Sequence, residues 1–394
     1  MVQRAKRLQI LKVMVLSWLL GSRIMTSAQA AERTVNIGFA GPISGLSASA
    51  GKSMLNAARM AVDDLNHAAV NVNGDKLNFV LLVQDDRSNP QIAELAAGYF
   101  IRRKVVGVVG IFNSAVALNS SIMYQRAGIA HFAVSGSRKF TRQGHDSAFR
   151  LAGYDEQRAN VLAAFAVNEL GKNRIAILYA DSLYGSSYRE KYANTLARLG
   201  ARVVSSEAVS ATTFDFNGAL VNAKAAHPDV VFFAGLGDQS AMLARAMRRL
   251  GIKVPLVTSA SIANANYLNV AGVSAEDTVA IMPGLHQNKS ASLQHFEKEY
   301  LQRYNSQAGA YAASVYDQVR VLGAAIMQAG TTNPADIVNA LHTIRHQGLS
   351  GNIAFDANGD LRELAFSMYQ VQHGSWVLLK QYHFGADATS RLDH

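Results

Sequence analysis

The chain has 394 residues, of which 49% are hydrophobic and 17% charged, and it contains no cysteine. This composition supports a sizeable core and two to three domains, and it excludes a disordered chain. Without cysteine, disulfides, thiolate metal sites, a cysteine nucleophile and a lipid attached to a cysteine are excluded as well.

The first 30 residues are typical of a secretory signal peptide. Four bases precede a short apolar run at residues 13–20, and small residues at Ala28 and Ala30 favour cleavage after Ala30. The alternative is a membrane anchor, but the apolar run is shorter than the roughly 20 residues that a spanning helix needs. An exported chain without a lipid anchor indicates the periplasm.

The net charge of +10 falls once this segment is removed, because residues 1–30 hold five bases and no acid. The remaining 33 basic and 28 acidic residues give +5. No dense Lys/Arg cluster with interleaved aromatic residues is present, so nucleic-acid binding is not expected.

In chain order, an apolar run at 35–41 predicts a strand and the run at 55–68 predicts a helix. Residues Leu55, Ala58, Val62, Leu65 and Ala69 follow one another at intervals of three and four on one helix face. Short apolar runs rich in β-branched residues then predict buried parallel strands. These runs are residues 77–86, 104–110, 128–134, 174–180, 201–207, 229–235 and 253–259.

Helical segments separate these strands, for example residues 239–251, which end in basic residues and a glycine. Alternating strands and helices predict an α/β fold with doubly wound, Rossmann-like parallel sheets. Because one compact domain does not hold so many strands, we expect two lobes.

The C-terminal part departs from this alternation. Helices are expected at 290–305, 310–329 and 333–346, followed by an alternating segment at 364–382. That segment predicts a hairpin around His373-Gly374.

Polar turns follow the predicted strands. Parallel sheets bind ligands at the carboxyl ends of their strands, where hydroxyls and free helix N–H groups hold small polar or anionic groups. The six turns are residues 43–51, 112–115, 135–137, 180–185, 235–240 and 259–265. They predict a polar cleft for a small molecule.

The stretch "ISGLSASAGKSM" (43–54) raises the alternative of a nucleotide phosphate loop. That motif requires four residues between its glycines and ends in Gly-Lys-Ser/Thr. Here five residues separate Gly45 from Gly51, and Leu46 stands where the first glycine should be. The other interpretation is a strand–turn–helix in which Gly51 allows the turn and Ser53 caps the helix.

Catalytic and metal motifs are weak. His342 and His346 are four residues apart, but no acid lies between them as a metalloprotease helix requires. Solvated helix-end histidines are the simpler interpretation, and no Gly-x-Ser-x-Gly is present. Asp155 and Asp181 follow strands and are candidates for ligand binding or for helix capping, whereas Asp63-Asp64 is expected on a solvated helix face.

Seven segments in order resemble the leucine/isoleucine/valine-binding family, the type I periplasmic solute-binding proteins of ABC importers. They are "VNIGFAGPISG" (35–45), "QDDRSNP" (84–90), "VVGIFNSA" (108–115), "FTRQG" (140–144), "FRLAGYDEQRA" (149–159), "RIAILYADSLYG" (174–185) and "FDANGDL" (355–361). The resemblance spans about 33–382.

The resemblance implies two lobes joined by a three-segment hinge that closes around a ligand. By position, the segments are expected near 152–155, 281–283 and 364–366. Lobe one would then be 33–153 plus 283–364, lobe two 154–282 plus 365–384, and 385–394 a C-terminal tail.

The resemblance also implies the ligand-binding residues. Ser114 would bind a ligand carboxylate, the turn Ser135, Gly136, Ser137 would bind carboxylate and ammonium, and Tyr184 would cover the ligand. Each has a structural alternative, such as an N-cap for Ser114 or a packed surface aromatic for Tyr184. Ser44 would begin a turn lining the cleft, and the adjacent acids Asp85-Asp86 would belong to a family pattern and not to a magnesium site.

Two positions depart from the family pattern. The acid that pairs with an amino-acid ammonium is replaced by Ala260, between Ser259 and Ser261, and an aromatic residue before the first helix is replaced by Ala50. A buried ammonium without a carboxylate is unfavourable. Either an acid replaces it, the candidates being Asp155, Asp181 and Asp238, or the ligand is not an ordinary branched-chain amino acid.

We therefore expect a periplasmic binding protein, and not an enzyme, for an amino acid or a related small carboxylate or amide. It would be a monomer without cofactor or metal that delivers the ligand to an inner-membrane ABC permease. The alternatives are a periplasmic ligand sensor for a membrane receptor and a nucleotide-binding enzyme that uses Lys52.

Overall fold

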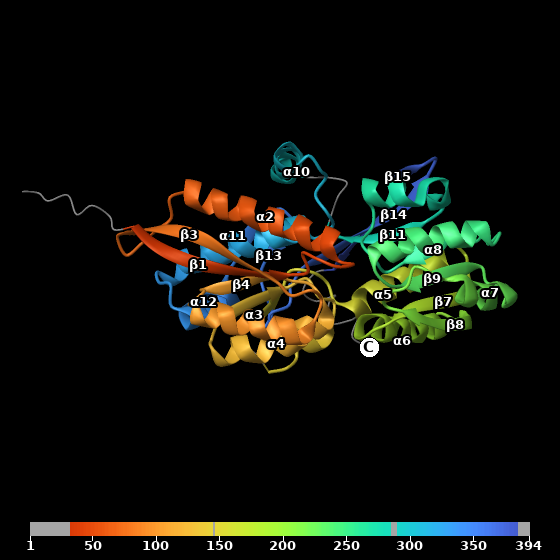
Figure 1. The fold of residues 1–394 in the computed structure, drawn as a ribbon, viewed down its shortest axis with the longest axis horizontal. Coiled ribbons are helices and arrows are strands. Elements are labelled where there is room, and N and C mark those ends of the chain that lie inside the picture. Colours follow the sequence, from red (N-terminus) through yellow and green to blue (C-terminus); the bar gives the residue numbers. More distant parts are fainter. Residues whose placement is uncertain (1–31, 145, 285–289, 385–394) are drawn as a thin grey trace, which may run out of the picture.

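The computed structural model describes residues 32–144, 146–284 and 290–384, and these fold into two lobes that lie side by side (Figure 1). The expected signal peptide (1–30) and C-terminal tail (385–394) lie outside the described residues. Within the described ranges, no helix combines the length and apolar character needed to cross a membrane.

The first lobe contains a six-stranded sheet in the order β2-β3-β1-β4-β5-β6. Its strands are β1 (Glu32–Gly41), β2 (Asn71–Val72), β3 (Asp75–Asp85), β4 (Gly107–Ile111), β5 (Ala130–Ala133) and β6 (Ala148–Arg150). All neighbouring strands are parallel except β2 and β3, which form a short hairpin. Strand β1 lies between β3 and β4, so the order in which the strands follow one another reverses beside β1. Open α/β sheets bind ligands at such a topological switch point.

Helices cover both faces of this sheet. Apolar side chains of α2 (Ala48–His67), α11 (Ala312–Ala329) and α12 (Pro334–Thr343) form one core with the strands. Those of α3 (Pro90–Arg102) and α4 (Ser114–Arg126) form the second core on the other face. The helix α10 (Ala291–Tyr304) packs on the outside of α2, and the 3-10 turn η1 (Arg138–Thr141) follows β5.

The second lobe contains a seven-stranded sheet in the order β15-β14-β11-β10-β9-β7-β8. Its strands are β7 (Arg174–Asp181), β8 (Arg202–Ser210), β9 (Val230–Ala234), β10 (Leu256–Thr258), β11 (Val279–Pro283), β14 (Leu364–Gln372) and β15 (Ser375–Phe384). The first five are parallel, whereas β14 and β15 are antiparallel additions at the edge.

Two helical layers again enclose the sheet. One contains α5 (Asp155–Ala164), the π turn η2 (Phe165–Glu169) and α6 (Leu183–Arg198). The other contains α7 (Asn217–Ala225), α8 (Gly237–Arg249), α9 (Ala265–Ala271) and the 3-10 turn η3 (Gly272–Ala275). The α/β class and the two doubly wound lobes predicted from the sequence are thus confirmed.

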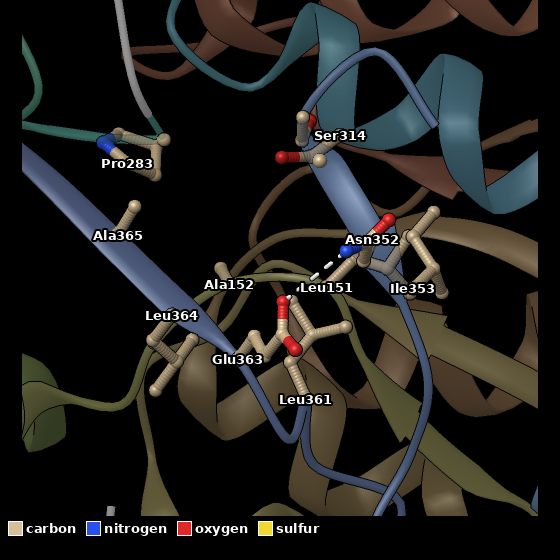
Figure 2. A pocket seen from close by; sticks show the side chains of 14 residues that line it. Leu151, Ala152, Pro283, Ser314, Asn352, Ile353, Leu361, Glu363, Leu364 and Ala365 are labelled. Carbon is tan, nitrogen blue, oxygen red and sulfur yellow. Dashed lines mark hydrogen bonds between the residues drawn. The ribbon is translucent and has the colours of Figure 1, made fainter. Parts of the chain in front are cut away.

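The chain passes between the lobes after β6, after β11 and before β14. A small antiparallel ribbon, β12 (His346–Gly348) with β13 (Gly351–Ile353), lies close to the last passage. A cavity of about 40 Å³ lies at this place and is lined by residues of all three passages (Figure 2). The hydrogen bond of 3.4 Å between Asn352 and Glu363 borders it. The lobe limits at individual residues stay predictions.

Every predicted strand is present, with ends that differ by up to three residues. The C-terminal hairpin is also confirmed, since β14 and β15 are joined by His373 and Gly374 at φ 53° and 72°. Two left-handed residues in a row match the twist of antiparallel strands.

The stretch 43–54 enters a helix earlier than the sequence predicted. Helix α2 begins at Ala48, so Gly51, Lys52 and Ser53 lie inside the helix and no loop is available to surround a phosphate. The preceding residue is Ser47, so Ser53 does not cap the helix; its hydroxyl instead accepts from the backbone N–H of Gly309 at 2.7 Å. The phosphate-loop interpretation is wrong.

The interpretation of the two histidines as helix-end residues holds for His342, which lies in the last turn of α12 and is not buried. It is wrong for His346, which lies beyond the helix and begins β12. His342 is hydrogen-bonded to the Asp146 carbonyl at 2.7 Å, and burial lowers the pKa of His346. The described residues contain no group of three or more His, Asp or Glu side chains that could hold a metal. Asp63 and Asp64 are not simply solvated, since they bind Arg303 and the Tyr316 hydroxyl.

Candidate functional site: the cleft between the lobes

A cavity of about 840 Å³ lies between the two lobes. Protein sites for small molecules typically measure about 300–1,000 Å³, so this cavity has the size of a ligand site and the 40 Å³ cavity of Figure 2 does not. The first lobe lines it with Ser114, Ser137, Arg138, Lys139 and Arg142. The second lobe contributes Asp155, Glu156, Leu183, Tyr184, Ser186, Ser187, Arg189, Glu190 and Lys191.

The first lobe presents a cluster of hydroxyl groups. Ser114 is the first residue of α4, and its Oγ accepts a hydrogen bond of 3.2 Å from the Oγ of Ser135, which lies two residues after the end of β5. The backbone N–H of Ser137 donates to the Ser135 Oγ at 3.3 Å. The strand ends thus bring three of the predicted serines together.

The start of α4 is open to a ligand. The preceding residue, Asn113, makes no side-chain capping bond, and its amide oxygen is buried without a hydrogen-bond partner in the described structure. The first N–H groups of a helix carry positive partial charge and are not bonded within the helix. Together with the Ser114 hydroxyl, they form a site suited to a carboxylate.

A buried arginine holds the 135–137 turn in place. Arg150, at the end of β6, donates through Nη1 to the carbonyls of Ser135 at 3.1 Å and Ser137 at 2.8 Å. Its charge is paired with Asp360, which accepts from Nε at 2.8 Å and also from the Thr141 hydroxyl. The segments "FRL" and "GDL" are therefore brought together to support the turn.

The second lobe touches this turn through α5. The N–H of Asp155 donates to the carbonyl of Gly136 at 2.8 Å, and a Cβ at position 136 would lie 1.9 Å from the Asp155 Oδ1. Only glycine allows this close approach. Asp155 and Gly136 thus form part of the contact between the lobes.

Asp155 is engaged in a buried ion pair. Its Oδ1 accepts from Arg158 Nη2 at 2.7 Å, and both side chains are almost fully buried. Burial raises the pKa of Asp155, and the Arg158 guanidinium opposes that shift. Arg158 also donates through Nη1 to the Tyr311 hydroxyl at 3.0 Å, and this hydroxyl lies 3.5 Å from the Ser261 Oγ. Tyr311 precedes α11 of the first lobe, so this chain of contacts crosses the cleft.

Tyr184, in the first turn of α6, faces the cavity from the second lobe. Its hydroxyl donates to the Ser259 Oγ at 2.8 Å, and its ring meets that of Tyr188 edge-on at 5.6 Å. Burial raises the pKa of the Tyr184 hydroxyl, so it is a neutral hydrogen-bonding group.

Three candidate residues from the sequence, Ser44, Asp181 and Asp238, do not line the cavity. The Ser44 hydroxyl donates to Asp85 Oδ2 at 2.5 Å, and neither Ser44 nor Asp238, in the first turn of α8, is among the residues that line the cavity. Asp181 is exposed at the end of β7. Partial burial opposes ionisation of Asp85, but hydrogen bonds from Ser44, Arg87 and Ile43 lower its pKa.

Sequence reasoning missed Arg150 and Arg158. In the sequence both resemble ordinary surface bases. They are buried in the fold because their partners Asp360 and Tyr311 come from distant parts of the chain. The three-residue spacing of Asp155 and Arg158 could have indicated their ion pair, since residues three apart on a helix are neighbours.

Comparison with known proteins gives a consistent result. The sequence profile described as periplasmic binding protein matches residues 34–375. The leucine-, isoleucine-, valine-, threonine- and alanine-binding protein of Pseudomonas aeruginosa is 25% identical over 338 residues, covering 86% of this chain and 90% of that protein.

Solved structures agree on the fold. The leucine-binding protein of Thermotoga maritima superposes with a TM-score of 0.80 at 24% identity, covering 90% of this chain and 99% of that one. A solute-binding protein of an ABC transporter from Rhodopseudomonas palustris, in complex with 3,4-dihydroxybenzoic acid, reaches 0.78 at 19% identity, covering 89% and 97%. Since the family profile spans most of the sequence, the chain belongs to the periplasmic binding protein family.

Proposed function

We propose that the protein captures an amino acid or a related small carboxylate or amide in the cleft between its lobes and delivers it to an ABC importer in the inner membrane. The family and the named relatives are binding proteins, and the protein is not an enzyme. The 840 Å³ cavity, lined by Ser114 and Ser137 from one lobe and Tyr184 from the other, is the observation that carries the proposal.

The geometry supports capture of a carboxylate. The Ser114 hydroxyl and the uncapped start of α4 would receive it, Ser135 and Ser137 would complete the polar surface, and Tyr184 would cover the ligand from the second lobe. Asp155, Gly136 and Ser261 lie at the contact between the lobes, where closure around a ligand would change their surroundings. We place the protein in the periplasm, where the relatives' family acts, with cleavage of the signal near Ala30.

The proposal is tested by thermal unfolding of the exported protein after bound ligand has been removed by unfolding and refolding. The compounds are branched-chain, aromatic and acidic amino acids, simple carboxylates, amides, and ATP with magnesium. A ligand present at a hundred times its dissociation constant stabilises the fold by about 2.7 kcal/mol, and a melting curve resolves this. We expect a shift with an amino acid, carboxylate or amide; a shift with ATP alone would refute the proposal.

A further inference from the structure

The cleft offers little negative charge for an ammonium group. Ala260 occupies the position where the resemblance implies an acid, and its N–H is already bonded to the Thr258 hydroxyl at 3.1 Å. Asp155 is neutralised by Arg158 at 2.7 Å, and Glu156 forms an ion pair with Lys191. An ammonium placed at Asp155 would therefore lie next to the Arg158 guanidinium.

Cations instead dominate the cavity lining. Five basic residues line it, against three acids. Arg142 is paired with Asp360 at 3.0 Å and with Asp356 at 3.8 Å, and Lys191 is paired with Glu156, so their charges are compensated within the protein. The Arg138 guanidinium lies 5.4 Å from the Tyr154 ring centroid. The remaining acid, Glu190, is exposed on α6, where solvent screens its charge as it screens that of an exposed cation at the cavity.

Two uncompensated cations face the cavity from opposite lobes. Lys139, on η1 of the first lobe, is exposed and makes no ion pair within the described ranges. Arg189, on α6 of the second lobe, lies with its guanidinium 5.5 Å from the Tyr179 ring centroid. Its Nε is buried and has no hydrogen-bond partner in the described part of the chain.

Three helices also begin at this cavity. Ser114, Asp155 and Leu183 are the first residues of α4, α5 and α6, and all three line it. The positive ends of these helices add to the field of the side chains. Because such a field acts on the whole cavity, it favours a ligand that carries more than one negative charge.

We propose that the ligand is a small dicarboxylic acid without a free ammonium group. One carboxylate binds at Ser114 and the start of α4, and the second binds between Lys139 and Arg189. This inference rests on the proposed function, because it assigns a ligand class to the same cleft.

Calorimetric titration of the ligand-free exported protein tests the inference. The probes are unbranched dicarboxylates of three to six carbons, the monocarboxylates of matching length, leucine and glutamate. Since a hydrogen bond to a charged group corresponds to about tenfold or more in affinity, a dicarboxylate should bind at least about tenfold tighter than its matched monocarboxylate and than leucine.

Variants locate the second carboxylate. Lys139→Gln with Arg189→Gln should weaken dicarboxylate binding by about tenfold and leave monocarboxylate binding unchanged, which also shows that the variant is folded. Lys253→Gln with Arg248→Gln removes two exposed cations of the second lobe, neither of which lines the cavity, and should change neither affinity.

The outcomes separate the two proposals. Tight binding of leucine that is lost in Ser114→Ala and unaffected by the Lys139/Arg189 variant overturns the dicarboxylate inference and supports the proposed function. Equal weakening of mono- and dicarboxylates by the Lys139/Arg189 variant also overturns the inference. If no compound binds, or if Ser114→Ala changes no affinity, the proposed function fails and the inference fails with it.

Discussion

At the scale of single residues, the acid Asp86 shows how burial changes the chemistry of a side chain. Asp86, next to the acid that binds Ser44, is fully buried; its Oδ1 accepts from the Ser88 N–H at 2.8 Å, and its Oδ2 has no hydrogen-bond partner in the described structure. Burial raises the pKa of Asp86 to about 6, and the neighbouring Asp85 charge adds to the shift. The sequence shows only an acidic pair, expected to belong to a family pattern and not to a magnesium site, and it does not reveal that Asp86 lies in the core.

The raised pKa makes stability depend on pH. Between about pH 4 and pH 6 the folded protein keeps a proton that the unfolded chain releases, so the free energy of unfolding falls as pH rises through this window. Asp86→Asn keeps the Ser88 bond and removes the charge. Its stability relative to the parent should rise by about 2–3 kcal/mol between pH 3.5 and pH 7, measured by urea unfolding. The prediction is refuted if the difference in free energy of unfolding between Asp86→Asn and the parent does not change with pH. It is also refuted if the exposed control Asp336→Asn shows the same change with pH.

At the scale of elements, apolar runs identified the strands because parallel strands are buried on both faces. Helix starts were harder to predict. The segment 48–54 contains Gly51 and two serines, residues that favour turns, yet it forms the first turns of α2, and Gly51 passes close to Pro42. This close approach explains why position 51 is a glycine, without a phosphate loop.

Gly51 tests this explanation. A helix interior normally gains stability when glycine is replaced by alanine, but a Cβ at position 51 would lie 2.0 Å from the Pro42 carbonyl oxygen. Gly51→Ala should therefore lower the free energy of unfolding by about 1–3 kcal/mol. Gly218→Ala in α7, where a Cβ meets nothing within 4 Å, is the matched control and should be neutral or slightly stabilising. Equal effects of the two changes in thermal unfolding would contradict the account.

At the scale of the whole molecule, the site exists only because two lobes meet. The strand-end turns predicted a polar cleft, and the family resemblance indicated Ser114, the 135–137 turn and Tyr184, all of which lie in or beside one interlobe region. The link from Asp155 through Arg158 and Tyr311 towards Ser261 could not be predicted. It joins residues more than 150 positions apart, and no pattern within one lobe specifies it.

The central claim is that both lobes bind one ligand, and titration calorimetry of two variants tests it most directly. With the compound that stabilises the protein most, Ser114→Ala in the first lobe and Tyr184→Ala in the second should each weaken binding by about tenfold or more, since each removes a contact to the buried ligand. Ser274→Ala, in η3 of the second lobe, is the control and should bind normally. Loss of affinity in both variants, with unchanged far-ultraviolet circular dichroism, is the predicted result. Full affinity in either one would contradict a ligand held between the lobes.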